Sequence, residues 1–188
     1  MLLFLVPDTP QPAQRPHTAD SMGDFSAGKV FTSVEFAPVL ASDFDQFVTD
    51  VEGKFEQLGV GLGAPAGAPG DAVDQLAGRI SVGTAAELAV CLMQWRDGGF
   101  SVKEFEIHNC GQLIADADAA GAGAPFVIGH DLDDGLLLMG PSDGALFTAD
   151  PGAELVPINL DLSQYLGIFR NELAMGKLEW ADGWVSTA

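Results

Sequence analysis

The residues best suited to chemistry are two cysteines and three histidines, and His108 and Cys110 stand two positions apart. On a β-strand these two side chains would point to the same side, and a thiol beside an imidazole is the pairing that a cysteine nucleophile needs. No local signature and no motif for an oxyanion hole accompanies the pair. We therefore expect His108 and Cys110 to occupy a strand in which the thiol is structural, and an enzyme that uses Cys110 is a rival hypothesis.

The same residue types form no metal-binding pattern. Cys91, Cys110 and the histidines are scattered without the C-x-x-C or H-x-x-x-H spacing that places ligands around zinc. Gly61–Gly63 resembles the start of a dinucleotide fingerprint, but the third glycine is misplaced and Pro65 follows. The sequence therefore predicts neither a metal ion nor a cofactor.

Carboxylates are the other candidates, and their densest group is residues 131–135, which read Asp-Leu-Asp-Asp-Gly. Alternating carboxylates begin a calcium loop, but the glycine comes one position early and Ser142 stands where the closing glutamate belongs. Three interpretations stay open: a solvated turn between two strands, an acidic loop that contacts a partner, and a cation site. A catalytic carboxylate pair has no specific support, because 27 acidic residues supply many accidental pairs.

The charge of the chain favours contact with a basic partner among the functional interpretations. Eight Lys and Arg residues against 27 Asp and Glu residues give a net charge of −19, and no Lys or Arg occurs from Glu104 through Phe169. Such a surface repels nucleic acid and anionic lipid and attracts a basic protein. The residues that we expect to contact this partner are Asp131, Asp133, Asp134, Asp143 and Asp150.

Cysteine usage and the first residues bear on the compartment. Two isolated cysteines are typical of a reducing cytosol. Residues 1–6 are apolar, but they lack a basic segment and run into Pro7, which indicates a first strand rather than an export signal. No stretch approaches the run of about 18 apolar residues that a membrane span needs. We expect a soluble, cytoplasmic protein that is a monomer or a weak homodimer.

Apolar periodicity predicts a single α+β domain over residues 1–188, with a mixed or antiparallel sheet packed against helices. We divide it into N-terminal strands and a helix (1–80), a core (80–175) and a C-terminal tail (176–188). The predicted strands lie near residues 2–6, 29–36, 104–108, 125–129, 135–139, 144–149 and 154–160. The predicted helices lie near residues 42–58, 84–97 and 163–175, with a short one over 71–79.

Turn and capping residues sharpen this prediction. Gly140–Gly144 contains proline and glycine between two apolar runs, which predicts the turn of a hairpin. Pro157 removes one hydrogen-bond donor and favours an edge strand or the end of a strand. Ser42, Thr84 and Ser163 stand where helix N-caps belong, and Glu87 completes a capping-box pattern with Thr84.

Five segments between residues 80 and 175 repeat a known order of motifs. They are residues 88–100, 125–129, 134–138, 142–150 and 162–166. Their order and spacing resemble the SUKH superfamily, whose bacterial members are mostly immunity proteins that neutralise toxins of polymorphic and contact-dependent systems.

The resemblance implies a function without catalysis. The protein would be an immunity protein that binds a cognate toxin stoichiometrically and occludes it. A basic nuclease or deaminase would suit so acidic an inhibitor, because enzymes that act on nucleic acids keep cationic grooves. The alternatives are a regulatory scaffold module that binds a cellular protein and, as a third hypothesis, an enzyme.

Overall fold

The computed structural model describes residues 37–62, 66–181 and 184–187, all within the unit Val34–Ala188. The predicted strands over residues 2–6 and 29–36 lie outside these ranges. The helices are α1 (Phe44–Gln57), α2 (Gly70–Ala77), α3 (Leu88–Trp95), α4 (Cys110–Ala120) and α5 (Leu162–Ala174). The strands are β1 (Ser101–Val102), β2 (Phe105–Ile107), β3 (Phe126–His130), β4 (Leu136–Met139), β5 (Ala145–Ala149), β6 (Val156–Asp161), β7 (Leu178–Ala181) and β8 (Trp184–Thr187).

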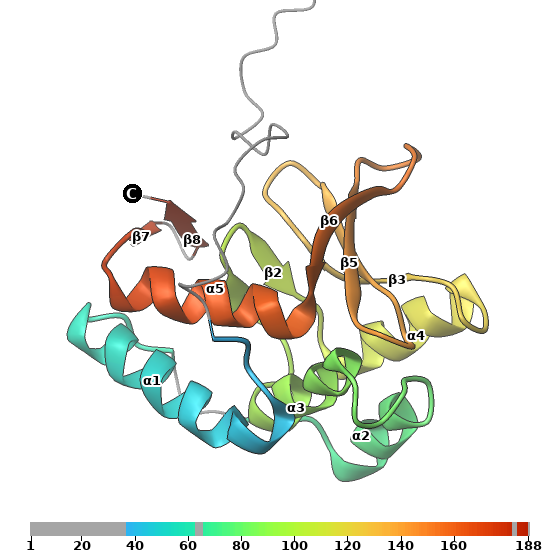
Figure 1. The fold of residues 1–188 in the computed structure, drawn as a ribbon, viewed down its shortest axis with the longest axis horizontal. Helices are drawn as coiled ribbons and strands as arrows, with labels where there is room; N and C mark the ends of the chain where they lie inside the picture. Colours follow the sequence, from blue (N-terminus) through green and yellow to red (C-terminus); the bar gives the residue numbers. More distant parts are fainter. Residues whose placement is uncertain (1–36, 63–65, 182–183, 188) are drawn as a thin grey trace, which may run out of the picture. The chain divides into compact units, whose positions relative to one another are not determined.

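The main sheet has six strands in the order β1-β2-β3-β4-β5-β6, and every neighbouring pair is antiparallel (Figure 1). Together with the five helices of the described residues, it confirms the predicted α+β class. The predicted hairpin is present, because Met139 pairs with Leu146 on the two sides of the turn. The N–H of Gly140 donates to Ala145 O at 2.8 Å, and Gly144 takes a φ of 78°, which glycine adopts without strain.

Antiparallel connectivity separates the loops into two groups. The β3–β4 loop (131–135) and the β5–β6 loop (150–155) lie at one end of the sheet, and the β4–β5 turn (140–144) lies at the other end (Figure 1). The β1–β2 turn, at residues 103–104, is on the same end as the first two loops. We call these three connections together the acidic end of the sheet.

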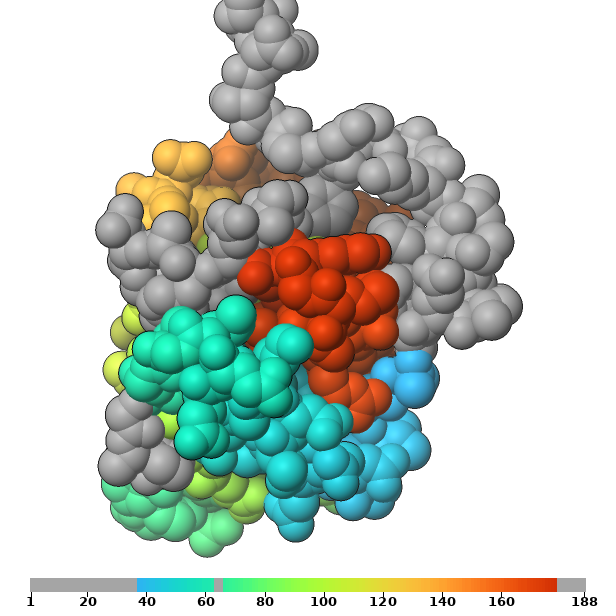
Figure 2. Space-filling model, turned by 90° about the vertical axis from the view of Figure 1, so that its left-hand side faces the viewer, coloured from blue at the N-terminus to red at the C-terminus, as the bar shows by residue number. Residues whose placement is uncertain are grey.

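Apolar stripes on the helices form the core as predicted. Phe47 lies 6.2 Å from the Trp95 ring and 6.5 Å from the Phe169 ring, which joins α1, α3 and α5. Figure 2 shows α1 against α5 on one face of the molecule. The expected apolar stripe of α5 is buried at all four of its positions, Leu162, Leu166, Phe169 and Leu173. Leu58, predicted to extend the α1 stripe, is exposed because it follows the end of the helix.

The prediction of a strand through His108 and Cys110 was wrong. Strand β2 ends at Ile107, and α4 begins at Cys110. The physical reason is an N-cap: the Asn109 side chain accepts the N–H of Gln112 at 2.9 Å and satisfies one donor of the first turn. Thus His108 and Cys110 belong to different elements.

Helix caps also differ from the predictions. Asp161, not Ser163, caps α5, and it forms a capping box with Gln164, while Ser163 is buried in the first turn. No side-chain cap forms at Thr84, whose hydroxyl donates to Ser81 O at 2.7 Å. Helix α5 begins at Leu162, so Asp161 is in the N-cap position and accepts the N–H of Gln164 at 2.8 Å, whereas Ser163 already lies inside the helix.

The short helix predicted over 71–79 is present as α2. Ser42, predicted to cap the helix near 42–58, directs its hydroxyl toward Asp43 at 3.4 Å instead of toward the helix backbone. Part of the predicted C-terminal tail is ordered as strands. Strands β7 and β8 pair antiparallel, with Leu178 opposite Thr187. Strand β6 is the last strand of the sheet, as Pro157 predicted.

Candidate functional site

The structure brings together four of the five acidic residues that the sequence singles out. Asp131, Asp133 and Asp134 lie on the β3–β4 loop and Asp150 begins the β5–β6 loop, so all four are at the acidic end of the sheet. Asp143 is in the β4–β5 turn at the opposite end. The predicted set is therefore split between two surfaces.

Asp131 folds the β3–β4 loop. Its Oδ1 accepts the N–H of Asp133 at 2.9 Å and the N–H of Gly135 at 2.7 Å, and its own N–H donates to Gly135 O at 2.9 Å. A Cβ on Gly135 would lie 2.5 Å from the carboxylate. Asp131 is thus held by the protein, whereas Asp133 and Asp134 are exposed to solvent.

Asp143 has a comparable role in its own turn. Its Oδ1 accepts the N–H of Ala145 at 3.0 Å. The neighbouring Gly144 packs so closely on Ala86 that a Cβ would lie 2.6 Å from the Ala86 nitrogen. This carboxylate stabilises the hairpin next to the segment that leads into α3.

Exposed apolar side chains at the acidic end escaped the sequence reasoning. Leu132 is 69% exposed, Leu155 41% and Val156 58%. Leu132 stands between aspartates, and Leu155 and Val156 follow the acidic β5–β6 loop. The sequence feature that could have revealed them is Leu132, a leucine inside an aspartate-rich turn where a solvated loop would carry a polar residue.

A partly buried carboxyl group lies in the β1–β2 turn at the same end. Burial raises the pKa of Glu104 above its ordinary value, and the negative charges of Glu172 and Asp131 act in the same direction. Lys103, in the same turn, lies 3.1 Å from Glu172 Oε2 and has a φ of 56°. The Tyr165 hydroxyl donates to Val102 O at 3.3 Å, and burial raises the pKa of this hydroxyl.

A second polar constellation joins α4 to the sheet. His108 Nδ1 lies 3.0 Å from Asp116 Oδ2, and His108 Nε2 lies 3.1 Å from His130 Nδ1. The other oxygen of Asp116 accepts from Gln112 Nε2 at 2.9 Å. In such a chain of carboxylate and imidazole groups, the hydrogen bonds determine which ring nitrogen of each histidine carries the proton. The chain is also able to relay a proton. Sequence reasoning missed Asp116 because it missed helix α4.

Cys110 is badly placed for nucleophilic chemistry. Its side chain is 1% exposed in the first turn of α4, and its backbone N–H donates to Asp97 Oδ1 at 2.7 Å. Burial, and secondarily the Asp97 charge, raises the pKa of the Cys110 thiol, which disfavours the thiolate that would attack a substrate. Burial likewise raises the pKa of the half-buried Cys91.

Comparison of the chain with protein-family models, with curated proteins and with solved structures finds no match. The resemblance to the SUKH superfamily stays a prediction.

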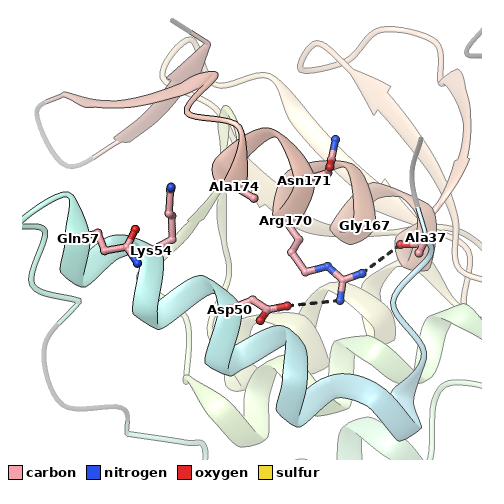
Figure 3. A pocket seen from close by; sticks show the side chains of 8 residues that line it. All are labelled: Ala37, Asp50, Lys54, Gln57, Gly167, Arg170, Asn171 and Ala174. Atoms are coloured by element: carbon pink, nitrogen blue, oxygen red, sulfur yellow. Dashed lines mark hydrogen bonds and ion pairs between the residues drawn. The ribbon is translucent and has the colours of Figure 1, made fainter. Parts of the chain in front are cut away.

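A groove of about 510 Å³ lies between α1 and α5 (Figure 3). Arg170 spans it, with its guanidinium 3.8 Å from Asp50 and 3.4 Å from Ala37 O. Gly167 allows the backbone at Ala37 to pack closely against α5, because a Cβ at this glycine would lie 2.5 Å from the Ala37 oxygen. We interpret the groove as a packing seam between the helices, closed by Arg170.

The described parts of the chain contain no group of three or more His, Cys, Asp or Glu placed to hold a metal ion. No helix in residues 37–62, 66–181 and 184–187 has the length and apolar character to cross a bilayer. The acidic end of the sheet is the best candidate site, because its exposed carboxylates and apolar side chains are suited to recognition by charge and apolar contact.

Proposed function

We propose that this protein binds a basic protein partner through the acidic end of the sheet and inhibits that partner stoichiometrically, as an immunity protein does with its toxin. The observation that supports this proposal is the convergence of the β3–β4 and β5–β6 loops at one end of the sheet. These two loops carry Asp131, Asp133, Asp134, Asp150 and Glu154 and no Lys or Arg.

The negative charges on these two loops favour recognition of a cation-rich surface. Like charges on neighbouring loops raise each other's free energy, and a cationic partner relieves this repulsion. Complementary charge mainly accelerates association, and screening over a Debye length of about 8 Å at physiological ionic strength makes the acceleration salt-dependent. The partner should therefore associate fast at low salt.

A stoichiometric binder explains the site better than an enzyme does. Asp131 and Asp143 are engaged in folding their own turns. The thiol of Cys110, the best catalytic candidate of the sequence, is buried in the core. A binder needs only exposed charge and apolar contact, and Asp133 and Asp134 supply the exposed charge.

The toxin partner follows from the resemblance and from charge. Nucleases and deaminases that act on nucleic acids carry cationic grooves, so an acidic inhibitor would fill such a groove and exclude the substrate. An inhibitor of this kind would act in the cytoplasm. A regulatory module that binds a cellular protein is the second candidate, and it would use the same surface.

Co-purification with the product of the neighbouring gene tests the proposal, since an immunity gene should sit directly beside the gene of its toxin. A 1:1 complex that is retained at moderate salt would support the immunity function. Inhibition of the partner's activity at an equimolar ratio would support the inhibitory role directly. A neighbouring gene product that shows no binding would refute the immunity function. The surface itself is tested with Asp133→Asn and Asp134→Asn together, because Asn also tolerates the φ of 63° at position 134.

A matched control removes the same number of charges elsewhere. Glu56→Gln on α1 and Asp74→Asn on α2 together remove two exposed carboxylates from the helices. Both variants lose equal net charge, so a difference in binding between them reports the location of the site. Equal effects would show that only the net charge matters.

A further inference from the structure

Three apolar side chains protrude among the carboxylates of the acidic end. Leu132 sits on the β3–β4 loop, and Leu155 and Val156 sit where the β5–β6 loop enters the edge strand. The two loops connect neighbouring strand pairs, so their centres are separated by about 10 Å, or two strand spacings. Single exposed apolar residues are ordinary, and these three are of interest because the sheet brings their loops to the same end.

The edge strand beside this group resists pairing with another strand. Pro157 has no N–H to donate, and Asn159 has a φ of 60°, which bends the backbone away from extended geometry. The β5–β6 pairing also shifts register between Ala145 and Phe147. A partner that added a strand to β6 would meet an interrupted hydrogen-bonding edge, so side-chain contact is the mode that remains.

We propose that Leu132, Leu155 and Val156 form an apolar anchor that inserts into an apolar depression on the partner, and that the depression is rimmed by Lys and Arg. This proposal rests on the proposed function and specifies the chemistry of the partner's surface. The rim follows from charge complementarity, since Asp133, Asp134, Asp150 and Glu154 flank the three apolar side chains in sequence. A second copy of this chain does not fit, because two acidic ends would face each other.

The anchor and the carboxylates have separable kinetic roles. Charge acts at long range and governs the on-rate, whereas buried apolar contact forms only in the complex and governs the off-rate. Loss of the anchor should therefore speed dissociation and leave the salt dependence of association unchanged. Loss of the carboxylates should lower the on-rate and weaken its salt dependence, and it should leave the off-rate unchanged.

A selection from a phage-displayed random peptide library on the immobilised full-length chain tests the anchor without knowledge of the native partner. We expect the enriched peptides to combine Lys or Arg with large apolar residues. The variant with Leu132→Ser and Leu155→Ser should release a synthetic copy of the best peptide about tenfold faster. Leu132→Ser alone serves as a milder variant, and circular dichroism verifies that each variant is folded.

Val82→Ser is the matched control. Val82 is 76% exposed, more than any anchor residue, and the neighbouring Ser81 donates its N–H to Pro141 O at 2.8 Å, which places Val82 at the opposite end of the sheet. Its substitution should leave the off-rate unchanged. An equal effect of Val82→Ser and the double variant would overturn the anchor.

Two further outcomes would also overturn the proposal: a selection that enriches no sequence, and one that enriches basic peptides without apolar residues. The second result would leave the proposed function intact, since it would still show recognition of a cationic partner by charge. Failure of the proposed function has a different signature, namely that the product of the neighbouring gene does not bind the chain.

Discussion

The Oδ1 atom of Asp131 lies 2.7 Å from the backbone nitrogen of Gly135, and this hydrogen bond closes the β3–β4 loop. The same oxygen accepts the N–H of Asp133 at 2.9 Å. Asp131 therefore serves the fold, and this relationship separates it from the exposed carboxylates beside it.

Asp131→Ala should destabilise the protein by about 1–3 kcal/mol, because two backbone donors lose a charged acceptor. Asp133→Ala, on the exposed part of the same loop, should change the free energy of unfolding by less than about 0.5 kcal/mol. Urea denaturation measures both. Equal stabilities of the two variants would contradict the role of Asp131 in the loop.

Gly167→Ala should destabilise the protein by about 1–3 kcal/mol, because the added Cβ would lie 2.5 Å from the Ala37 oxygen. Gly53→Ala on α1 is the control, since nothing lies within 4 Å of its Cβ position. Alanine there should stabilise α1 by about 0.5–1 kcal/mol. Thermal denaturation of both variants checks the opposite signs, and a Gly167→Ala variant as stable as the wild type would contradict the close packing at Gly167.

Glu104→Gln should stabilise the protein at neutral pH. Burial raises the pKa of Glu104 in the folded state above its ordinary value of 4.5, so the folded state binds the proton more tightly than the unfolded state does. The stability of the wild type then falls as pH rises from 4.5 toward the raised pKa. Glutamine removes this dependence.

Denaturation at a series of pH values measures the Glu104 effect. The stability difference between Glu104→Gln and the wild type should be largest above the raised pKa and should shrink toward pH 4.5, the ordinary value. A variant that is less stable than the wild type at neutral pH would contradict the account. Glu56→Gln, at an exposed position, serves as the control.

Cys110 should react slowly with a thiol reagent in the native protein. Its side chain is 1% exposed, and burial raises its thiol pKa, so little thiolate is available at neutral pH. The half-buried Cys91 should react first. Timed reaction of the wild type and of Cys110→Ala separates the two thiols, and fast modification of Cys110 in the folded state would support the enzyme hypothesis.

The sequence predicted those elements whose signals are local and strong. The β4–β5 hairpin has apolar runs on both sides of a proline and glycine turn, and α5 has an unbroken apolar stripe. Helix α4 was missed because its alanine-rich sequence has a weak stripe, with Cys110 and Leu113 its only buried residues. The cap at Asn109 was the available signal.

The candidate site was predicted only in part, because its geometry depends on the sheet. Sequence proximity placed Asp143 with Asp134 and Asp150, but the antiparallel course of β4 and β5 puts it at the other end. The contact of His108 with His130, 22 residues apart, requires the pairing of β2 with β3. Neither relationship is encoded in local spacing.

The most direct test of the central claim is the on-rate for the purified product of the neighbouring gene, measured from low to high salt. We predict that Asp133→Asn with Asp134→Asn lowers the on-rate at low salt by about threefold or more and flattens its salt dependence. The helix variant Glu56→Gln with Asp74→Asn should retain the wild-type slope. An unchanged on-rate and an unchanged slope for the loop variant would mean that the acidic end of the sheet is a solvated surface and not the partner site.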